Sequence, residues 1–188
     1  MTVSSERLNA IYAATDDPWD FATSPYEQAK FQATREALSR SQYRASLEIG
    51  CGNGELARHL APLCKRYTGI DAVGRAVLAA GRAVPSARFV QGFYPCPLPA
   101  GDFDLIVISE FLYFLGRDDI RALAKDLSAR WPLAELLCVT YLGETDHTLQ
   151  GIDALEVFTG TLAETHRFET RRSTDFYRID IAQPEGHA

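Results

Sequence analysis

Short apolar runs alternate with longer amphipathic segments along most of the chain. The apolar runs have the length and flanking residues of strands, and they cover Leu47–Ile49, Tyr67–Ile70, Ala87–Gln91, Phe103–Ser109 and Glu135–Leu142. The segments between them have helical periodicity. They predict one helix that starts near Glu55 and three more, over Val73–Val84, Asp118–Arg130 and Gly151–Leu162. Strands and helices that alternate in this way are typical of a parallel sheet with helices on both faces.

The chain closes with two segments in which polar and apolar residues alternate, Thr165–Arg172 and Asp175–Ala182. A period of two predicts strands, and their closeness in the chain predicts an antiparallel hairpin added to the edge of the sheet. The sequence therefore predicts an α/β fold: a single Rossmann-like, seven-stranded, mostly parallel sheet with helices on both faces and a C-terminal β-hairpin.

Residues 1–44 precede the first strand and predict two helical pieces. Pro25 suits the first turn of the second piece, which extends to about Leu38. Its expected apolar face contains Tyr26, Ala29, Ala33 and Ala37. We expect this segment to form an N-terminal helical cap, or lid, on one domain whose core is residues 45–188, because 188 residues suffice for one well-buried domain and are few for two.

The first predicted strand leads into a turn with glycine at alternate positions, Gly50, Gly52 and Gly54. Glycine accepts a positive φ and has no Cβ, so such a turn lets a ligand approach the backbone N–H groups that precede the following helix. Asp71 ends the next strand, where a carboxylate can accept hydrogen bonds from both hydroxyls of a ribose. Turn and acid together predict a nucleotide site, and glycines that serve only to form the turn are the alternative.

The spacing of the glycines indicates which nucleotide binds. Dinucleotide sites usually have G-x-G-x-x-G, whereas this turn has G-x-G-x-G, and Glu48 lies two residues before the first glycine, where it would repel a pyrophosphate but suits an amino group. The stretch resembles the first motif, acid-x-G-x-G-x-G, of the class I S-adenosylmethionine-dependent methyltransferases, which Glu48, Gly50, Gly52 and Gly54 match. The resemblance implies that S-adenosyl-L-methionine is the cofactor, with the turn along its methionine and ribose and Asp71 on the ribose.

We expect further residues beside the cofactor, namely Cys51, Ala72, Gly92, Phe93, Tyr94, Ser109 and Trp19. Cys51 is expected to be a small filler rather than a nucleophile, because no histidine lies near it in the sequence. Trp19 is expected either to face the positive sulfonium or to anchor its loop. Phe93 stands where this class commonly has an acid, so aromatic contact of Phe93 or Tyr94 with the adenine is expected, with loop packing as the alternative.

Two longer segments narrow the resemblance to one family. Asp17-Pro18-Trp19 with Ser-Pro-Tyr-Glu-Gln at residues 24–28, and later the run 103–115, are similar to the NodS family of methyltransferases, over about residues 17–142. The best-known member of that family N-methylates the glucosamine of rhizobial chito-oligosaccharides. The resemblance implies N-methylation of a small-molecule or saccharide acceptor, and O-methylation of a small metabolite is the alternative.

Polar residues after two predicted strands are candidates for chemistry on the acceptor. Glu110 follows the run 103–109, at the edge where open α/β sheets bind ligands. His147 lies in the polar loop 143–149, and an imidazole with a pKa near 6.5 can take a proton near neutral pH. We expect either residue to act as base or to position the acceptor, while a structural ion pair and a solvated histidine are the alternatives. Aromatic residues expected to line the acceptor pocket are Tyr26, Tyr113 and Tyr141.

Charge and cysteine content limit the other partners. The net charge of −6 argues against a nucleic-acid surface or an anionic membrane as partner, and there is no apolar run of about 18 residues. The four cysteines form no C-x-x-C pair, so we expect neither a metal site nor a disulfide framework, and a reducing cytoplasm. His59, His166 and His187 have no supporting neighbours and are expected at the surface.

Two rival interpretations use the same turn. An NAD(P)-dependent oxidoreductase would need a catalytic pair such as Tyr-x-x-x-Lys, which occurs only at Tyr26 and Lys30, before the glycine turn. A non-catalytic binding protein of methyltransferase fold is the other rival, and the intact turn with Asp71 argues against it only weakly.

Overall fold

A computed structural model describes residues 3–185, and its elements follow the predicted alternation. The helices are α1 (Ser5–Ile11), α2 (Pro25–Ala37), α3 (Glu55–Leu60), α4 (Gly74–Ala83), α5 (Arg117–Arg130) and α6 (Gly151–Leu162), with 3-10 turns η1 (Ala61–Leu63) and η2 (Leu112–Phe114). The strands are β1 (Ser46–Ile49), β2 (Tyr67–Asp71), β3 (Arg88–Gln91), β4 (Leu105–Ser109), β5 (Glu135–Tyr141), β6 (His166–Ser173) and β7 (Tyr177–Pro184). The predicted strands are confirmed, with ends that differ by one or two residues.

The seven strands form one sheet in the order β3-β2-β1-β4-β5-β7-β6. The strands β1 to β5 run parallel, and β7 lies antiparallel between β5 and β6. The predicted mostly parallel sheet and its C-terminal hairpin are therefore confirmed. A dinucleotide-binding sheet has six strands in the order 3-2-1-4-5-6, so the antiparallel β7 separates this sheet from that of the rival oxidoreductase. The order reverses at β1, and open α/β sheets bind ligands outside the carboxyl ends of the strands at that point.

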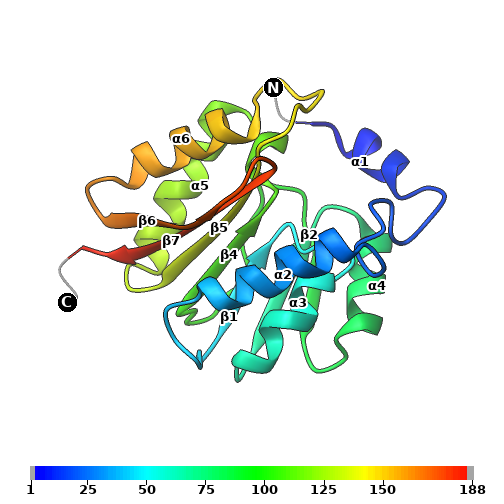
Figure 1. Ribbon diagram of the computed structural model, residues 1–188, viewed down its shortest axis with the longest axis horizontal. Coiled ribbons are helices and arrows are strands. Elements are labelled where there is room, and N and C mark those ends of the chain that lie inside the picture. The colour runs from blue at the N-terminus through cyan, green and yellow to red at the C-terminus, as the bar shows by residue number, and fades with distance from the viewer. Residues whose placement is uncertain (1–2, 186–188) are drawn as a thin grey trace.

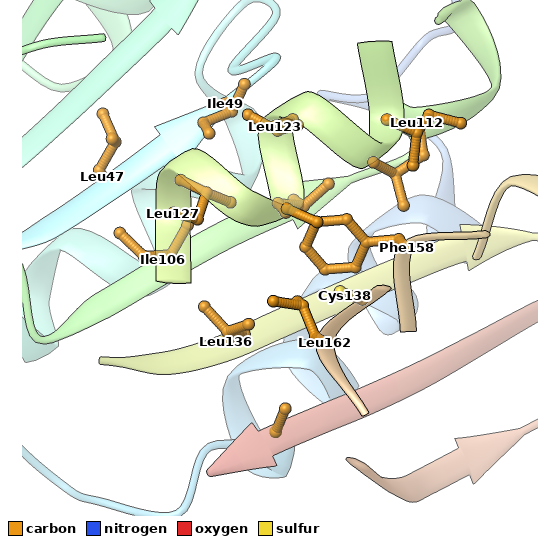
Figure 2. Close-up of a cluster of buried hydrophobic side chains, with 14 of the residues drawn as sticks. Leu47, Ile49, Ile106, Leu112, Leu123, Leu127, Leu136, Cys138, Phe158 and Leu162 are labelled. Atoms are coloured by element: carbon orange, nitrogen blue, oxygen red, sulfur yellow. The ribbon is translucent and has the colours of Figure 1, made fainter. Parts of the chain in front are cut away.

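Helices cover both faces of the sheet, with α2, α3 and α4 on one face and α5 and α6 on the other (Figure 1). Successive residues of a strand point to opposite faces, so in β1 Leu47 and Ile49 pack beneath α5 and α6. Figure 2 shows that cluster, to which the two helices contribute Leu123, Leu127, Phe158 and Leu162. The same alternation sends the side chain of Glu48 to the opposite face, where it meets Tyr67.

The N-terminal segment contains two helices, the short α1 near the carboxyl ends of the strands and the longer α2, which packs on the sheet. Helix α2 packs beside α3, with Phe31 in the core between these helices and the sheet. The predicted apolar face of α2 is wrong in part, because Tyr26 and Ala29 are exposed. Its buried residues are Lys30, Phe31, Ala33 and Thr34. That residues 1–44 act as a lid stays a prediction.

Gly54→Ala is expected to lower the free energy of unfolding by about 1–3 kcal/mol. Gly54 has a φ of +83°, and an added Cβ would lie 2.8 Å from the Cα of Ala80, a backbone atom of α4 that cannot yield unless the helix moves. The matched control is Gly81→Ala in α4, where an added Cβ meets nothing within 4 Å. The control is expected to raise the free energy of unfolding by about 0.5–1 kcal/mol, and urea denaturation measures both. Equal changes in the free energy of unfolding of the two variants would contradict the structural role assigned to Gly54.

Candidate functional site

A cavity of about 900 Å³ lies at the carboxyl ends of β1, β2 and β4. Side chains of α1 and of the loop 143–149 line it together with the turn after β1. The N-terminal segment is joined to the rest of the rim by a hydrogen bond from the Val3 N–H to the carbonyl oxygen of Phe114 (2.9 Å) and by an ion pair between Arg7 and Asp146. The reversal point of the sheet thus holds a space in the size range of cofactor sites.

The three glycines of the turn all have a positive φ, +80° at Gly50, +51° at Gly52 and +83° at Gly54. The turn is attached to β2, because the N–H groups of Gly50 and Cys51 donate to the carbonyl oxygen of Ile70, at 2.8 and 3.1 Å. Gly50 and Gly52 line the cavity, whereas Gly54 does not and packs against α4. A Cβ on Gly50 would lie 2.9 Å from the ring of Phe111, and one on Gly52 would lie 3.3 Å from the Tyr12 hydroxyl. All three positions therefore lack room for a side chain, and the first two are also part of the cavity lining.

Asp71 ends β2 and lines the cavity. Its Oδ2 accepts the N–H of Gly52 and its Oδ1 accepts the N–H of Val73, both at 2.9 Å. Burial raises the pKa of this carboxyl, and hydrogen bonds from the backbone N–H groups of Val73, Gly52 and Ala72 act in the opposite direction. The two oxygens of a carboxylate have about four acceptor positions together, so these N–H groups leave acceptor capacity for a ligand.

Glu48 lies in β1, is 1% exposed and lines the cavity. Its Oε2 accepts a hydrogen bond from the hydroxyl of Tyr67 at 3.0 Å. Burial raises the pKa of Glu48 to about 8, and the Tyr67 hydrogen bond offsets only part of that. The ligand-free protein therefore carries Glu48 mainly in the protonated form at pH 7.

The other residues expected around the cofactor line the same cavity, namely Cys51, Ala72, Gly92, Phe93, Tyr94, Ser109 and Trp19. The Trp19 ring stacks on Phe21 with ring centroids 5.3 Å apart, and it meets the ring of Tyr12 edge-on at 5.5 Å. Burial raises the pKa of the Cys51 thiol well above its usual value. The thiolate that a nucleophile requires is therefore absent near neutral pH.

Glu110 directly follows β4 and lines the cavity. It has a φ of +49°, and its N–H donates to the carbonyl oxygen of Val139 at 2.8 Å. Its Oε2 lies 2.7 Å from Nζ of Lys30, which also lies 2.8 Å from Oε2 of Glu27. Burial raises the pKa of the Glu110 carboxyl, and the Lys30 ammonium acts against this rise. Glu27 lines the cavity as well, so two carboxylates share one buried lysine at its wall.

His147 also lines the cavity, with its ring packed on two aromatic side chains. The ring is stacked on Tyr113 with centroids 5.5 Å apart, and it lies 4.6 Å from the ring of Phe114. Burial lowers the pKa of the imidazole, so it is neutral at pH 7. Its Nδ1 is buried and has no hydrogen-bond partner among residues 3–185. A neutral imidazole with an unpartnered ring nitrogen can accept a proton or a hydrogen bond.

Of the tyrosines expected to line an acceptor pocket, two line the cavity, Tyr113 and Tyr141. Tyr26 does not, and its side chain is 41% exposed. Its ring lies edge-on to Phe176 and Tyr177, with centroids 6.1 Å apart in both pairs, and 5.5 Å from Nζ of Lys30. Tyr26 thus covers the buried lysine from outside.

Several residues of the cavity and its wall were not predicted from the sequence. Tyr12 is 4% exposed, and its hydroxyl lies 3.3 Å from the place of a Cβ on Gly52. The Asn53 amide donates to Oδ1 of Asp17 at 2.9 Å and so joins the turn to the N-terminal segment. Glu27 and its partner lysine have the i,i+3 spacing of ordinary exposed helix pairs. Nothing in the spacing of these residues distinguishes them from surface residues.

The prediction that the remaining histidines lie at the surface is wrong for His166, which is 2% exposed at the start of β6. His59 is half-buried beside Gln28, and His187 lies outside the described residues. Within residues 3–185 no group of three or more His, Cys, Asp or Glu side chains could hold a metal ion. No helix in that part of the chain is long and apolar enough to cross a membrane.

Residues 5–130 match the family model described as Nodulation protein S (NodS). Nodulation protein S of Sinorhizobium fredii is 33% identical over 114 residues, 58% of this chain and 52% of that protein. Nodulation protein S of Rhizobium tropici is 35% identical over 111 residues, 55% of this chain and 45% of that protein. The chain thus spans about half the length of the curated relatives it matches.

The fold is also similar to a solved structure, that of N-methyltransferase NodS from Bradyrhizobium japonicum WM9 in complex with S-adenosyl-L-homocysteine. The TM-score is 0.80 at 23% identity, over 96% of this chain and 98% of that chain. At this low identity the structural likeness shows a shared fold and no more. The family model, in contrast, matches more than half of the sequence. The chain therefore belongs to the Nodulation protein S (NodS) family.

Proposed function

We propose that this chain is an S-adenosylmethionine-dependent methyltransferase that methylates the nitrogen of an amine. The observation that carries the proposal is the cavity at the reversal point of the sheet, which is lined both by the glycine turn with Asp71 and by the carboxylates of Glu27 and Glu110. Membership of the NodS family supports it, as does the likeness to N-methyltransferase NodS in complex with S-adenosyl-L-homocysteine.

The residues of the cavity fit the proposed cofactor. Asp71 lines the cavity and keeps acceptor capacity for the ribose, and the backbone of Gly50 and Gly52 lines the same space. Glu48 offers a buried carboxyl to the methionine ammonium, while the ring of Trp19 suits a sulfonium. When bound, S-adenosylmethionine supplies a methyl group on a positively charged sulfur.

Further cavity residues are proposed for the adenine and for the frame of the site. They are Cys51, Ala72, Gly92, Phe93, Tyr94 and Ser109. Phe93 and Tyr94 present aromatic rings to a planar base. Gly54 keeps a structural role behind the turn, because it packs against α4 rather than lining the cavity.

At the acceptor side we propose that Glu110 positions the amine and that His147 removes its proton. An ammonium has no lone pair, so the acceptor must lose a proton before its nitrogen can form a bond to carbon. The imidazole of His147 is neutral and lines the cavity, so it can take this proton. Tyr113 and Tyr141 are proposed to enclose the acceptor, since most of the rate of such a transfer comes from orientation.

For the acceptor itself we propose the free amino group of an amino sugar in a chito-oligosaccharide. The paired carboxylates of Glu27 and Glu110 favour a cationic amine over the neutral hydroxyl that an O-methyltransferase would bind. We also propose that the protein acts in the reducing cytoplasm, which its four free cysteines support.

The purified protein is expected to transfer a methyl group from S-adenosylmethionine to glucosamine and to de-N-acetylated chito-oligosaccharides, but not to their N-acetylated forms, which lack an ammonium. Mass spectrometry and NMR of the product measure the transfer and locate the methyl group. A methyl group on oxygen would contradict N-methylation. Cofactor binding with no transfer to any of these acceptors would favour the non-catalytic alternative.

Asp71→Ala is expected to weaken binding of S-adenosyl-L-homocysteine by about 1.5–3 kcal/mol, because it removes charge-assisted hydrogen bonds to the ribose. Isothermal calorimetry measures the affinity, and a thermal unfolding scan establishes that the variant is folded. Asp175→Ala, an exposed aspartate in the turn before β7, is the matched control and is expected to leave the affinity unchanged. Wild-type affinity in a folded Asp71→Ala protein would exclude the ribose role.

The affinity for S-adenosyl-L-homocysteine is expected to rise as the pH rises from about 6 to 8, because Glu48 has a pKa of about 8 in the free protein. Contact with the ligand ammonium favours the ionised form, so the complex holds fewer protons than the free protein and a higher pH favours binding. Calorimetry in buffers of different ionisation enthalpy should detect proton release in the wild type and none in Glu48→Gln. The same pH dependence in both proteins would refute the contact.

A further inference from the structure

Lys30 is a fully buried ammonium group on a helix that would otherwise cover the sheet with apolar residues. Its side chain is 2% exposed, and its Nζ lies 2.8 Å from Glu27 and 2.7 Å from Glu110. A buried charge is stable only when it is paired and hydrogen-bonded. Glu27 lies one turn away on α2, but Glu110 belongs to the end of β4, so Lys30 joins the helix to the cavity wall.

Glu110 is held in place from two directions. Its backbone has a φ of +49°, a conformation that side chains with a Cβ rarely adopt, and its N–H is bonded to the carbonyl oxygen of Val139 in β5. Its side chain is fixed through Oε2 by the Lys30 ammonium. Backbone strain of this kind persists only where the surroundings impose it, and such residues cluster at functional sites. Both restraints fix one carboxylate at the cavity.

The charges of this group do not cancel. Glu27 and Glu110 contribute two carboxylates, and Lys30 contributes one ammonium. Within residues 3–185 no other cation pairs with either carboxylate. Oε2 of Glu27 is buried and has no partner with hydrogen-bond geometry. One negative charge is therefore left over at the wall, for a ligand cation to neutralise.

We propose that Lys30 is a positioning residue, which keeps Glu110 as a fixed carboxylate. Glu27, Lys30 and Glu110 together then present a single net negative charge to an acceptor with one ammonium group. The inference rests on the proposed methyl transfer for the identity of the ligand. It adds that specificity for a singly charged amine comes from a lysine that does not itself line the cavity.

In the described part of the chain, no other side chain that faces Glu110 could replace Lys30 as its cationic partner. The other titratable side chains that interact with Glu110 are Tyr26 and Glu27 on α2 and Tyr113 in η2, and none of them is a cation. Tyr177 in β7 and Tyr141 in β5 interact in turn with Tyr26 and Tyr113 and are not cations either. Burial raises the pKa of Glu110, and Lys30 opposes that rise. An opposite charge at this distance typically lowers a carboxyl pKa by about one to three units. Loss of the ammonium should therefore raise the pKa of Glu110 further.

The test is a carbon-13 NMR titration of the glutamate carboxyl groups, with the Glu110 signal assigned from Glu110→Gln. In Lys30→Met, and in Lys30→Gln, which keeps an amide donor in case the methionine variant does not fold, the Glu110 pKa is expected to rise by about one to three units. Lys125→Met removes an exposed lysine of α5 as the matched control, and it is expected to leave the Glu110 titration unchanged. A folded Lys30 variant with the wild-type Glu110 titration overturns the proposal.

The second readout is the pH profile of methyl transfer to glucosamine as probe. Without Lys30, the acidic limb of kcat/KM should move to higher pH and KM should rise about tenfold or more below that limb, while Lys30→Arg should restore the wild-type limb. A uniform fall in kcat with an unmoved limb would mean a merely structural role and would overturn the proposal. If the wild type transfers no methyl group to glucosamine, the proposed function fails, and the carboxyl titration still decides the role of Lys30.

Discussion

The carboxylate of Asp71 is the point on which the geometry of the cavity depends. It ends β2 and accepts the N–H of Gly52 from the turn after β1 and that of Val73 from the start of α4. A partly buried carboxylate is stabilised by its hydrogen bonds, so a shift of the turn against β2 would cost the bond from Gly52. The positive φ of Gly52 belongs to this arrangement. The turn, the strand end and the helix start are thereby fixed around one ligand-sized space.

The cavity contains carboxylates that are buried in two different ways. Glu48 has a hydroxyl partner, Tyr67, and burial raises its pKa to about 8, so the proton itself removes most of its charge. Glu110 has an ammonium partner, Lys30, which opposes the rise in its pKa and fixes the side chain. The first group can change its charge when a cationic ligand arrives, and the second is held in place by a cation of the protein itself. This difference suits a site that must bind a cofactor and also hold an acceptor in the correct orientation for a reaction.

Much of the fold could be predicted from the sequence because its signals are local. The apolar runs, the glycine turn and Asp71 lie within short stretches, and each has one dominant structural reading. The buried face of α2 could be predicted only in part, since apolar periodicity favours Tyr26 and Ala29 over a lysine as buried residues. Its burial depends on Glu110, which is 80 residues away in the chain.

In the candidate site, too, the residues that could be predicted are those with local signals in the sequence. Residues on strand ends, such as Glu48 and Glu110, line the cavity because the topology of parallel strands brings their carboxyl ends together. Tyr26 is expected from the sequence to line the acceptor pocket, but it lies outside the cavity, packed on Phe176 from the turn before β7. Tyr12 lines the cavity through a contact between the N-terminal segment and Gly52 that no local pattern encodes.

The most direct test of the central claim is a pair of calorimetric titrations of the purified protein, one with S-adenosyl-L-homocysteine and one with NADH. The strand order, the position of Glu48 before the turn and Asp71 at the end of β2 lead us to expect micromolar binding of S-adenosyl-L-homocysteine and no binding of NADH. Binding of NADH without binding of S-adenosyl-L-homocysteine would contradict the account, and with it every role assigned here to the glycine turn.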